Sequence, residues 1–600
     1  MGCQLMARRT TRRAQSVVPF GVGSIVEFED EALMPAGLDA WPEREAERLF
    51  DDRLARRLHV QHFCLPPPKP EKGGVPGTMA PLPYVRFPQW HFCPRCRVLR
   101  RADLFDPKRP RCRNELASPR LGGKPPCGSR PERSQPTMIP LRFVAVCPAG
   151  HIEDFPWSAW AHTPSGQELT SSSGCGEEGL YFYSTRRGGL SGLIVACGVC
   201  GKKRSMMGTT SQGGLKGWRC SGNRPWLGKE ASEKCDAPPG PDGQSTMLGL
   251  QRGASNLYFP EVTSSILIPP YSTKLRQIVS DRRIMDALEA ASKDGVVRES
   301  VLVAFATLHD VDPDELREAY HAQSDSLADD STVDEAAFRH AEYLALHQER
   351  RDSEDALACR RQDISRYAPI IRDCFASVTL VERLTETRVL TGFSRISPGT
   401  TTSSSLSHGR VNWLPGFRVR GEGIFLGIDT ERLAEFDRRS GPRLGEMIRR
   451  AKAVDRSPLP VTPSLVLLHT LAHVLIKRLS FEAGYGTSSI RERVYATHED
   501  SGYSMGGMLL YTAAGDADGT LGGLVGLGRA GVLERVVAGA LADARWCGSD
   551  PICIESQGQG PDSLNLAACH ACALLPETSC EFQNRILDRQ VVLEFFSKDE

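Results

Sequence analysis

The stretch TPSLVLLHTLAHVLIKRLSFEAGYG, residues 462–486, decides how the last part of the chain folds. Thr462 is a typical N-cap residue, and Pro463 suits the first position of a helix. Apolar residues then recur at helical spacing and predict a buried stripe: Leu465, Leu468, Ala472, Leu475 and Leu479. His469 and His473 are four residues apart, so both imidazoles project from one face of the predicted helix.

Working outward from this helix, the sequence MGGMLLYTAA predicts a short buried strand, and a glycine-rich run leads into a second helix. The stretch ends in four cysteines spaced C-x15-C-x2-C-x7-C, which are Cys553, Cys569, Cys572 and Cys580. Four thiolates form a closed tetrahedral zinc site that has no open position for a catalytic water. We therefore predict one structural Zn2+ ion at this end of the chain.

This order of features resembles the helicase-associated zinc-binding domain found at the end of some DNA helicases and of their separate partner subunits. The matching features are the helix with His469 and His473, the RERVYA segment, the glycine-rich turn and the final cysteine cluster. The resemblance implies that residues 461–600 form such a domain and that its four cysteines hold one zinc ion.

Length, net charge and cysteine content indicate the number of domains, the partners that charge would favour and the state of the cysteines. A chain of 600 residues is too long for one core, so several domains are expected. The net charge of +1 gives the whole molecule no electrostatic bias toward DNA or membrane. No secretory signal and no transmembrane helix are expected, which predicts a cytoplasmic protein without membrane contact. The nineteen cysteines should then stay reduced, and their clustering favours metal over disulfides.

Two further cysteine clusters occur in the N-terminal half. The first contains Cys93, Cys96, Cys112 and Cys127, and the second contains Cys197, Cys200, Cys220 and Cys235. Each begins with a C-x2-C pair, which projects two thiolates from one turn as a tetrahedral zinc site requires. Both clusters end in two cysteines that are fifteen positions apart, which suggests two zinc-ribbon-like modules.

Three more candidate ligands lie between these clusters. Cys147 and His151 could bind a separate metal, perhaps together with Cys175. They could equally be a buried thiol and a capping imidazole, or either could replace a ligand of the first cluster. The sequence leaves these alternatives open.

The pattern of elements predicts an α+β multidomain protein with a β-rich, zinc-stapled N-terminal half, a helical middle and a C-terminal α/β zinc-binding domain. We place an N-terminal β-containing segment and linker at residues 1–92, and the β-rich domain with two zinc modules at 93–270. A mainly helical domain follows at 271–460, where Leu275, Ile278, Met285 and Leu288 mark an amphipathic helix.

Three functions compete for this chain: a non-motor accessory subunit, a zinc-dependent hydrolase or nuclease, and a self-sufficient DNA-binding zinc protein that relies on the basic segment 95–133. A zinc-dependent hydrolase or nuclease using His469 and His473 is one hypothesis, but H-E-x-x-H enzymes carry a glutamate where this chain has Thr470. The chain has no G-x-x-x-x-G-K-[ST] phosphate-binding loop, so we expect no ATPase activity of its own. We therefore favour a non-enzymatic subunit whose motor lies on another chain.

The N-terminal sequence RRAQSVVPFGVGSIVEFEDEALMPAGLDAW, residues 12–41, and CPAGHIEDFPW, residues 147–157, resemble the DrmB subunits of DISARM anti-phage systems. The resemblance implies a non-motor subunit that joins a DrmA-like helicase in a heterodimer or larger complex and supports binding of foreign DNA.

Lys and Arg dominate residues 95–133. Such a segment can neutralise phosphates without reading sequence, so Arg97, Arg100 and Arg101 are candidate DNA contacts. The competing interpretation is that these arginines only cover a zinc module or contact acidic protein surfaces.

Overall fold

The structure is a computed structural model. It describes residues 12–28, 31–43, 46–66, 82–105, 109–116, 121, 123–170, 174–237, 247–268, 275, 278–279, 282–293, 296–326, 334–350, 356–398, 403–454, 457–497, 502–512 and 523–597. It confirms the predicted fold class: cysteine clusters lie in a β-rich N-terminal half, helices follow in the middle, and another cysteine cluster lies near the C-terminus.

The chain divides into two compact units. Unit 1 comprises Met1–Leu49, Phe63–Thr263 and Val389–Phe417, and unit 2 comprises Phe50–His62, Ser264–Arg388 and Arg418–Glu600. The four segments predicted from the sequence run consecutively, whereas each unit is assembled from segments that are separated along the chain.

Unit 1 contains small antiparallel sheets. In strand order they are β1 (Val26–Phe28), β2 (Glu31–Pro35) and β5 (Tyr84–Arg86); β7 (Leu99–Arg101), β6 (Trp90–Phe92) and β8 (Ile139–Pro140); β10 (Ile152–Asp154), β9 (Phe143–Val146) and β14 (Leu248–Gln251); and β11 (Leu180–Ser184), β12 (Leu193–Cys197) and β13 (Lys203–Ser205). Helix α2 (Trp157–His162) packs on β12 and β13. The apolar side chains of Phe143, Phe155 and Trp157 meet in an apolar core of this unit.

A buried arginine links distant segments of unit 1. The Arg395 guanidinium donates hydrogen bonds to the carbonyl oxygens of Gly150, Leu257 and Gly23, at 2.9, 2.8 and 2.7 Å. Burial lowers the pKa of Arg395 to about 10, yet it remains charged at neutral pH. Gly150 has a φ of +83°, and a Cβ there would lie 1.8 Å from Oγ of Ser404, so only glycine fits this turn.

Unit 2 contains most of the helices. They are α1 (Asp52–Arg57), α4 (Arg282–Ala290), α5 (Glu299–His309), α6 (Pro313–Ser326), α7 (Glu335–His347), α8 (Pro369–Arg372), α9 (Thr430–Val454), α10 (Pro463–Ala483), α11 (Gly523–Leu527), α12 (Leu533–Ala544) and α13 (Arg589–Phe596). A short hairpin, β16 (Ser292–Lys293) and β17 (Val296–Val297), lies between α4 and α5.

The largest sheet of the described residues runs in the order β15 (Phe259–Ile266), β19 (Ser377–Ser394), β20 (Trp413–Gly427), β22 (Gly506–Thr512) and β21 (Ile490–Ala496). Strand β18 (Leu357–Arg361) pairs with β19, while β3 (Glu47–Leu49) pairs with β4 (His62–Leu65), which pairs with β20. Strands β15, β19 and β20 contribute residues to both units. The middle of the chain is therefore helical but also supplies the two longest strands.

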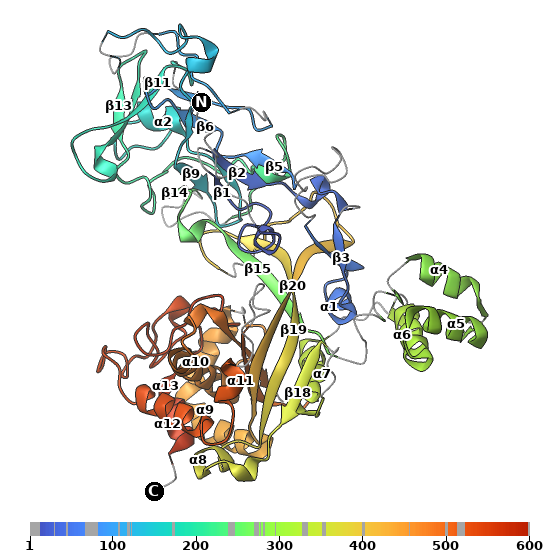
Figure 1. Cartoon of the computed structure of the whole chain (residues 1–600). Coiled ribbons are helices and arrows are strands. Elements are labelled where there is room, and N and C mark those ends of the chain that lie inside the picture. The colour runs from blue at the N-terminus through green and yellow to red at the C-terminus, as the bar shows by residue number, and fades with distance from the viewer. Residues whose placement is uncertain are drawn as a thin grey trace, which may run out of the picture. The chain divides into compact units, whose positions relative to one another are not determined.

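Helix α10 forms the centre of the unit 2 core. Oγ1 of Thr462 accepts the Leu465 N–H at 3.1 Å, and Gly484 ends the helix in a left-handed conformation. Helices α9, α12 and α13 and strands β21 and β22 all contact α10, and Figure 1 shows α9, α10, α12 and α13 gathered in one group.

By length and composition alone, α10 is long and apolar enough to cross a membrane. The sequence-based expectation was that no such segment occurs. However, 83% of its apolar window is buried inside the protein, as in a core helix. Its membrane-like composition therefore reflects its place in the core.

Candidate metal centres

Cluster I contains Cys93, Cys96, Cys112 and Cys127, the grouping expected from the sequence, and all four thiols are buried. The Cys93 and Cys127 sulfurs are 3.9 Å apart, and the Cys96 and Cys112 sulfurs are 3.6 Å apart. Four thiolates around a tetrahedral zinc ion, each about 2.3 Å away, would lie about 3.8 Å from one another. The cluster therefore has the donor type and the spacing that zinc requires.

The loop that carries Cys93 and Cys96 favours a thiolate at Cys93. The backbone N–H groups of Arg95 and Cys96 each donate to Sγ of Cys93 at 3.4 Å, as they do when a C-x2-C turn wraps a metal. Hydrogen bonds from Cys112 and Cys96 lower the pKa of Cys93 to about 2. The hydrogen bond with Cys93 in turn raises the pKa of Cys112, so these contacts favour the thiolate at Cys93 alone.

Cluster II joins two segments that the sequence analysis had kept apart. It contains Cys147, His151, Cys220 and Cys235. Nδ1 of His151 lies 3.3 Å from the Cys147 sulfur and 3.6 Å from the Cys220 sulfur, and the Cys147 and Cys235 sulfurs are 3.8 Å apart. Cys220 and Cys235, predicted to join Cys197 and Cys200, therefore lie with Cys147 and His151.

The second ring nitrogen of His151 is also held. Nε2 of His151 lies 2.9 Å from the carboxylate of Glu233, which forms an ion pair with Arg224 at 2.8 Å. A carboxylate behind a metal-binding histidine fixes the tautomer and orients the ring. This leaves Nδ1 of His151 as the nitrogen that faces the three sulfurs.

Cluster III contains Cys175, Cys197 and Cys200 together with His162, a residue that the sequence analysis did not select. Nδ1 of His162 donates to the Ser158 carbonyl at 2.7 Å, and its buried Nε2 has no hydrogen-bond partner among the described residues. That nitrogen is available to a metal. A backbone hydrogen bond from Lys202 contributes most to lowering the pKa of Cys200 to about 7.

Strand pairing explains why the two sets of ligands regroup. Strands β11 and β12 are antiparallel, with Leu180 opposite Cys197. The chain that enters β11, at Cys175, therefore lies beside the turn that leaves β12, at Cys200. Likewise, the β9–β10 turn places Cys147 and His151 together. Cys200 therefore belongs to cluster III, whereas Cys220, the next cysteine in the sequence, belongs to cluster II.

Cluster IV lies near the C-terminus and contains Cys547, Cys553, Cys569 and Cys572. The Cys547 and Cys569 sulfurs are 3.5 Å apart, and the Cys553 and Cys572 sulfurs are 3.7 Å apart. The sequence analysis placed Cys580 here and missed Cys547. The C-x5-C pair formed by Cys547 and Cys553 was the signal that could have identified the missing ligand.

Cys580 instead lies beside the two histidines of α10. His469, His473, Glu492 and Cys580 bring one donor atom each within 4.8 Å of the others, and all four residues are buried. We call this group the His–Glu–Cys cluster. The sequence analysis considered the two histidines but not Glu492, which lies on β21, the strand formed by the RERVYA segment.

The three candidate DNA-binding arginines do not share one surface. Arg100 and Arg101 are consecutive residues of β7, so their side chains leave opposite faces of the strand. Arg97 lies beside the Phe92 ring, with its guanidinium carbon 5.8 Å from the ring centre. All three arginines lie on the segment that carries cluster I.

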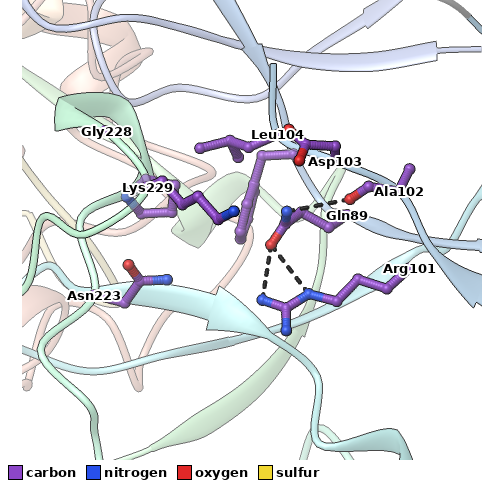
Figure 2. A pocket seen from close by; sticks show the side chains of 10 residues that line it. Gln89, Arg101, Ala102, Asp103, Leu104, Asn223, Gly228 and Lys229 are labelled. Atoms are coloured by element: carbon purple, nitrogen blue, oxygen red, sulfur yellow. Dashed lines mark hydrogen bonds between the residues drawn. The ribbon is translucent and has the colours of Figure 1, made fainter. Parts of the chain in front are cut away.

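Arg101 lines a surface pocket of about 480 Å³ in unit 1. Figure 2 shows Arg101 and Lys229 reaching toward Gln89 from different elements. The guanidinium of Arg101 donates to Oε1 of Gln89 at 2.9 and 3.2 Å, and Gln89 donates to the Ala102 carbonyl at 3.2 Å. This side chain is therefore positioned before any ligand binds.

Three similarities to known proteins extend over these elements. Residues 12–259 match a family described as a domain of unknown function, DUF8724. Residues 471–573 match the MrfA Zn-binding domain, a range that includes all four cysteines of cluster IV. The chain is 29% identical to the DISARM protein DrmB of Bacillus paralicheniformis over 591 aligned residues. This alignment covers 94% of this chain and 97% of that protein.

These matches agree with the sequence resemblance at both ends of the chain. The long alignment includes unit 1 with clusters I, II and III as well as unit 2, so the similarity is not confined to one metal site. The chain is a homologue of the DISARM protein DrmB, and it carries an MrfA Zn-binding domain near its C-terminus.

Proposed function

We propose that this chain is the DrmB subunit of a DISARM anti-phage system and acts there as a non-motor partner of a DrmA-like helicase. The observation that carries the proposal is the 29% identity over 94% of the chain to a DISARM protein DrmB. Near full-length similarity supports the same role better than a match to one shared domain does. In this proposal the subunit works in the cytoplasm, where it supports binding of foreign DNA within a heterodimer or larger complex.

Zinc has a structural role in this proposal. Clusters I and IV offer four thiolates, whereas clusters II and III offer three thiolates and one imidazole, and both donor sets fit closed zinc sites. Such sites leave no coordination position for water or substrate. The ions would hold loops in place, and the DNA-dependent chemistry would belong to the helicase subunit.

The alternative of a zinc-dependent hydrolase centred on His469 and His473 is less well supported. Hydrolysis needs a metal with an open position that substrate and water can reach. Both histidines and Glu492 are at most 1% exposed. The residue between the histidines that would be the catalytic base is Thr470, whose hydroxyl donates to the Val466 carbonyl of its own helix at 2.7 Å. These contacts favour a packed core.

The test is to purify this chain, its DrmA-like helicase and their mixture, and to measure assembly and ATP hydrolysis with and without DNA. We expect no hydrolysis by this chain alone, co-elution of the two proteins, and tighter DNA binding or faster DNA-dependent hydrolysis by the mixture. ATP hydrolysis by this chain alone, or two proteins that neither co-elute nor change each other's DNA binding, would contradict the proposal. A helicase sample without this chain provides the control.

A further inference from the structure

The His–Glu–Cys cluster is not explained by the proposed function. Its ligand atoms come from three separate places: helix α10, strand β21 and the loop that follows cluster IV. Residues 471–573 match the MrfA Zn-binding domain, so His469 and Cys580 lie outside the matched range. Metal binding by these four residues would not depend on the subunit role proposed above.

Glu492 occupies a position where the fold calls for an apolar side chain. Side chains alternate between the two faces of β21, so Glu492 shares its face with Ile490 and Val494, both of which pack in the same apolar core as α10. A carboxylate in such a place costs several kcal/mol unless positive charge or hydrogen bonds compensate for it. The backbone N–H of Glu581 donates to Oε1 of Glu492 at 3.2 Å, and the two histidines are the charged partners that could compensate further.

The histidines do not provide enough donors. Nδ1 of His473 lies 2.8 Å from the Ala573 carbonyl, and since a carbonyl only accepts, this nitrogen carries the proton. In the neutral ring, Nε2 of His473 is then a bare acceptor, 3.4 Å from an oxygen of Glu492. Neither this nitrogen nor Oε2 of Glu492 has a hydrogen-bond partner among the described residues. Two acceptors that face each other repel, and either a metal ion between them or a proton on Nε2 of His473 relieves that repulsion.

The fourth atom has the environment of a metal-bound thiolate. Sγ of Cys580 accepts backbone N–H groups from Phe582 at 3.3 Å and Asn584 at 3.2 Å. The same pattern surrounds Cys93 in cluster I, where two backbone N–H groups point at one sulfur. Nε2 of His469 lies 3.2 Å from this sulfur and 3.1 Å from Glu492.

These distances suit one small ion. Around a tetrahedral zinc, nitrogen and oxygen ligands would lie about 3.3 Å apart, and nitrogen and sulfur ligands about 3.5 Å apart. The two nitrogen–oxygen distances in the cluster are 3.1 and 3.4 Å, and the nitrogen–sulfur distance is 3.2 Å, which are close to these values. Imidazole, carboxylate and thiolate are all established zinc ligands.

We infer that His469, His473, Glu492 and Cys580 bind a zinc ion inside the core of unit 2, separate from the ion of cluster IV. The site is closed, because its four residues are at most 7% exposed. The ion ties α10 to β21 and to the C-terminal loop, and it neutralises the carboxylate and thiolate that face α10. Clusters I to IV and this site bring the total to about five zinc ions per chain.

The first experiment measures zinc per chain in full-length protein by elemental analysis, for wild type, Glu492→Gln and Cys580→Ala. We expect each variant to contain one zinc fewer than wild type. The matched control is Cys359→Ala, since Cys359 is also buried in unit 2 but joins none of the clusters found among the described residues. It should keep the wild-type number. Folded variants that retain the full zinc content would overturn the inference.

Either substitution could also disturb folding, so a second measurement uses wild-type protein alone. Anomalous X-ray scattering at the zinc edge, from crystals of the full chain, should place a peak between His469, Glu492 and Cys580, in addition to the peak at cluster IV. If cluster IV shows a peak and this position does not, the four residues form a buried ion pair network with protonated histidines, and the inference is wrong.

Discussion

Units 1 and 2 are stabilised in different ways. In unit 1, strands of two to five residues form small sheets, and clusters I, II and III lie at their turns. In unit 2, one core of buried Leu, Ile, Val and Phe residues surrounds α10. Short strands bury too little apolar surface to hold long loops in place, and bound metal can supply the missing free energy. Unit 2 also holds cluster IV and the His–Glu–Cys cluster, so the comparison suggests that unit 1 depends on metal to a greater extent than unit 2 does.

The largest expected effect tests the regrouped ligands of unit 1. The double variant Cys197→Ser/Cys235→Ser removes one ligand each from clusters III and II, so it should lose two zinc ions per chain. Each lost structural site removes on the order of 10 kcal/mol of binding free energy. Elemental analysis measures the loss of zinc, and limited proteolysis measures the loss of folding stability.

The control for this variant is Cys147→Ser/Cys235→Ser, which removes two ligands from cluster II alone. It should lose one zinc ion. Equal losses from the two double variants would mean that Cys197 and Cys235 share a site, as the sequence spacing first suggested.

The next effect tests the apolar core of unit 2. Leu468 is fully buried in α10, and Leu468→Ala should lower the free energy of unfolding by about 3 kcal/mol because it leaves a cavity. Phe481 lies on the same helix but is 77% exposed, so Phe481→Ala should change stability by about 0.5 kcal/mol or less. Chemical denaturation monitored by circular dichroism measures both. Similar losses for the two variants would show that α10 is not the packing centre.

A smaller effect is expected behind cluster II. Glu233→Gln removes the negative charge that orients His151, and this should weaken zinc binding at the cluster by roughly 10- to 100-fold. Competition with a coloured chelator measures the affinity. The control is Glu230→Gln, because Glu230 is a nearby exposed carboxylate outside the cluster. This variant should leave the zinc affinity unchanged. Unchanged affinity in Glu233→Gln would mean that the ion pair with Arg224 is the main role of this carboxylate.

The smallest effect concerns DNA binding by the assembled complex. Arg100 and Arg101 are both exposed on opposite faces of β7, but the guanidinium of Arg101 is held by hydrogen bonds to Gln89. We expect Arg100→Glu to weaken binding a few-fold and to reduce the slope of log affinity against log salt by about one, as when one phosphate contact is lost. Arg101→Glu should change neither. Fluorescence anisotropy over a salt series distinguishes the two variants, and a reversed order would place the DNA on the opposite face.

Sequence reasoning was most successful where ligands are close along the chain. Cys93 and Cys96 share a turn, so their grouping needed only local spacing. The caps of α10 at Thr462 and Gly484 also depend on adjacent residues, and the first of them was predicted. The general fold class followed from the same kind of local pattern.

The remaining ligands depend on pairing between strands, which spacing does not encode. All four ligands of cluster III lie in the sequence between His151 and Cys220 of cluster II, and the pairing of β9 with β10 and of β11 with β12 separates the two sets. Cys580 was assigned by its distance from Cys572, although it lies beside His469, which precedes it by 111 residues. Glu492 was overlooked, although the alternation of side chains in the RERVYA strand places it on the same face as Ile490 and Val494.

The contacts of Arg395 have a consequence for how the protein is synthesised. The carbonyls of Gly23, Gly150 and Leu257 leave the ribosome well before the guanidinium that binds them. Unit 1 therefore cannot be completed until most of the preceding part of unit 2 has been translated. A recombinant fragment cut after residue 259, where the match to the domain of unknown function ends, would lack this arginine, so the nascent N-terminal half is not expected to mature by itself.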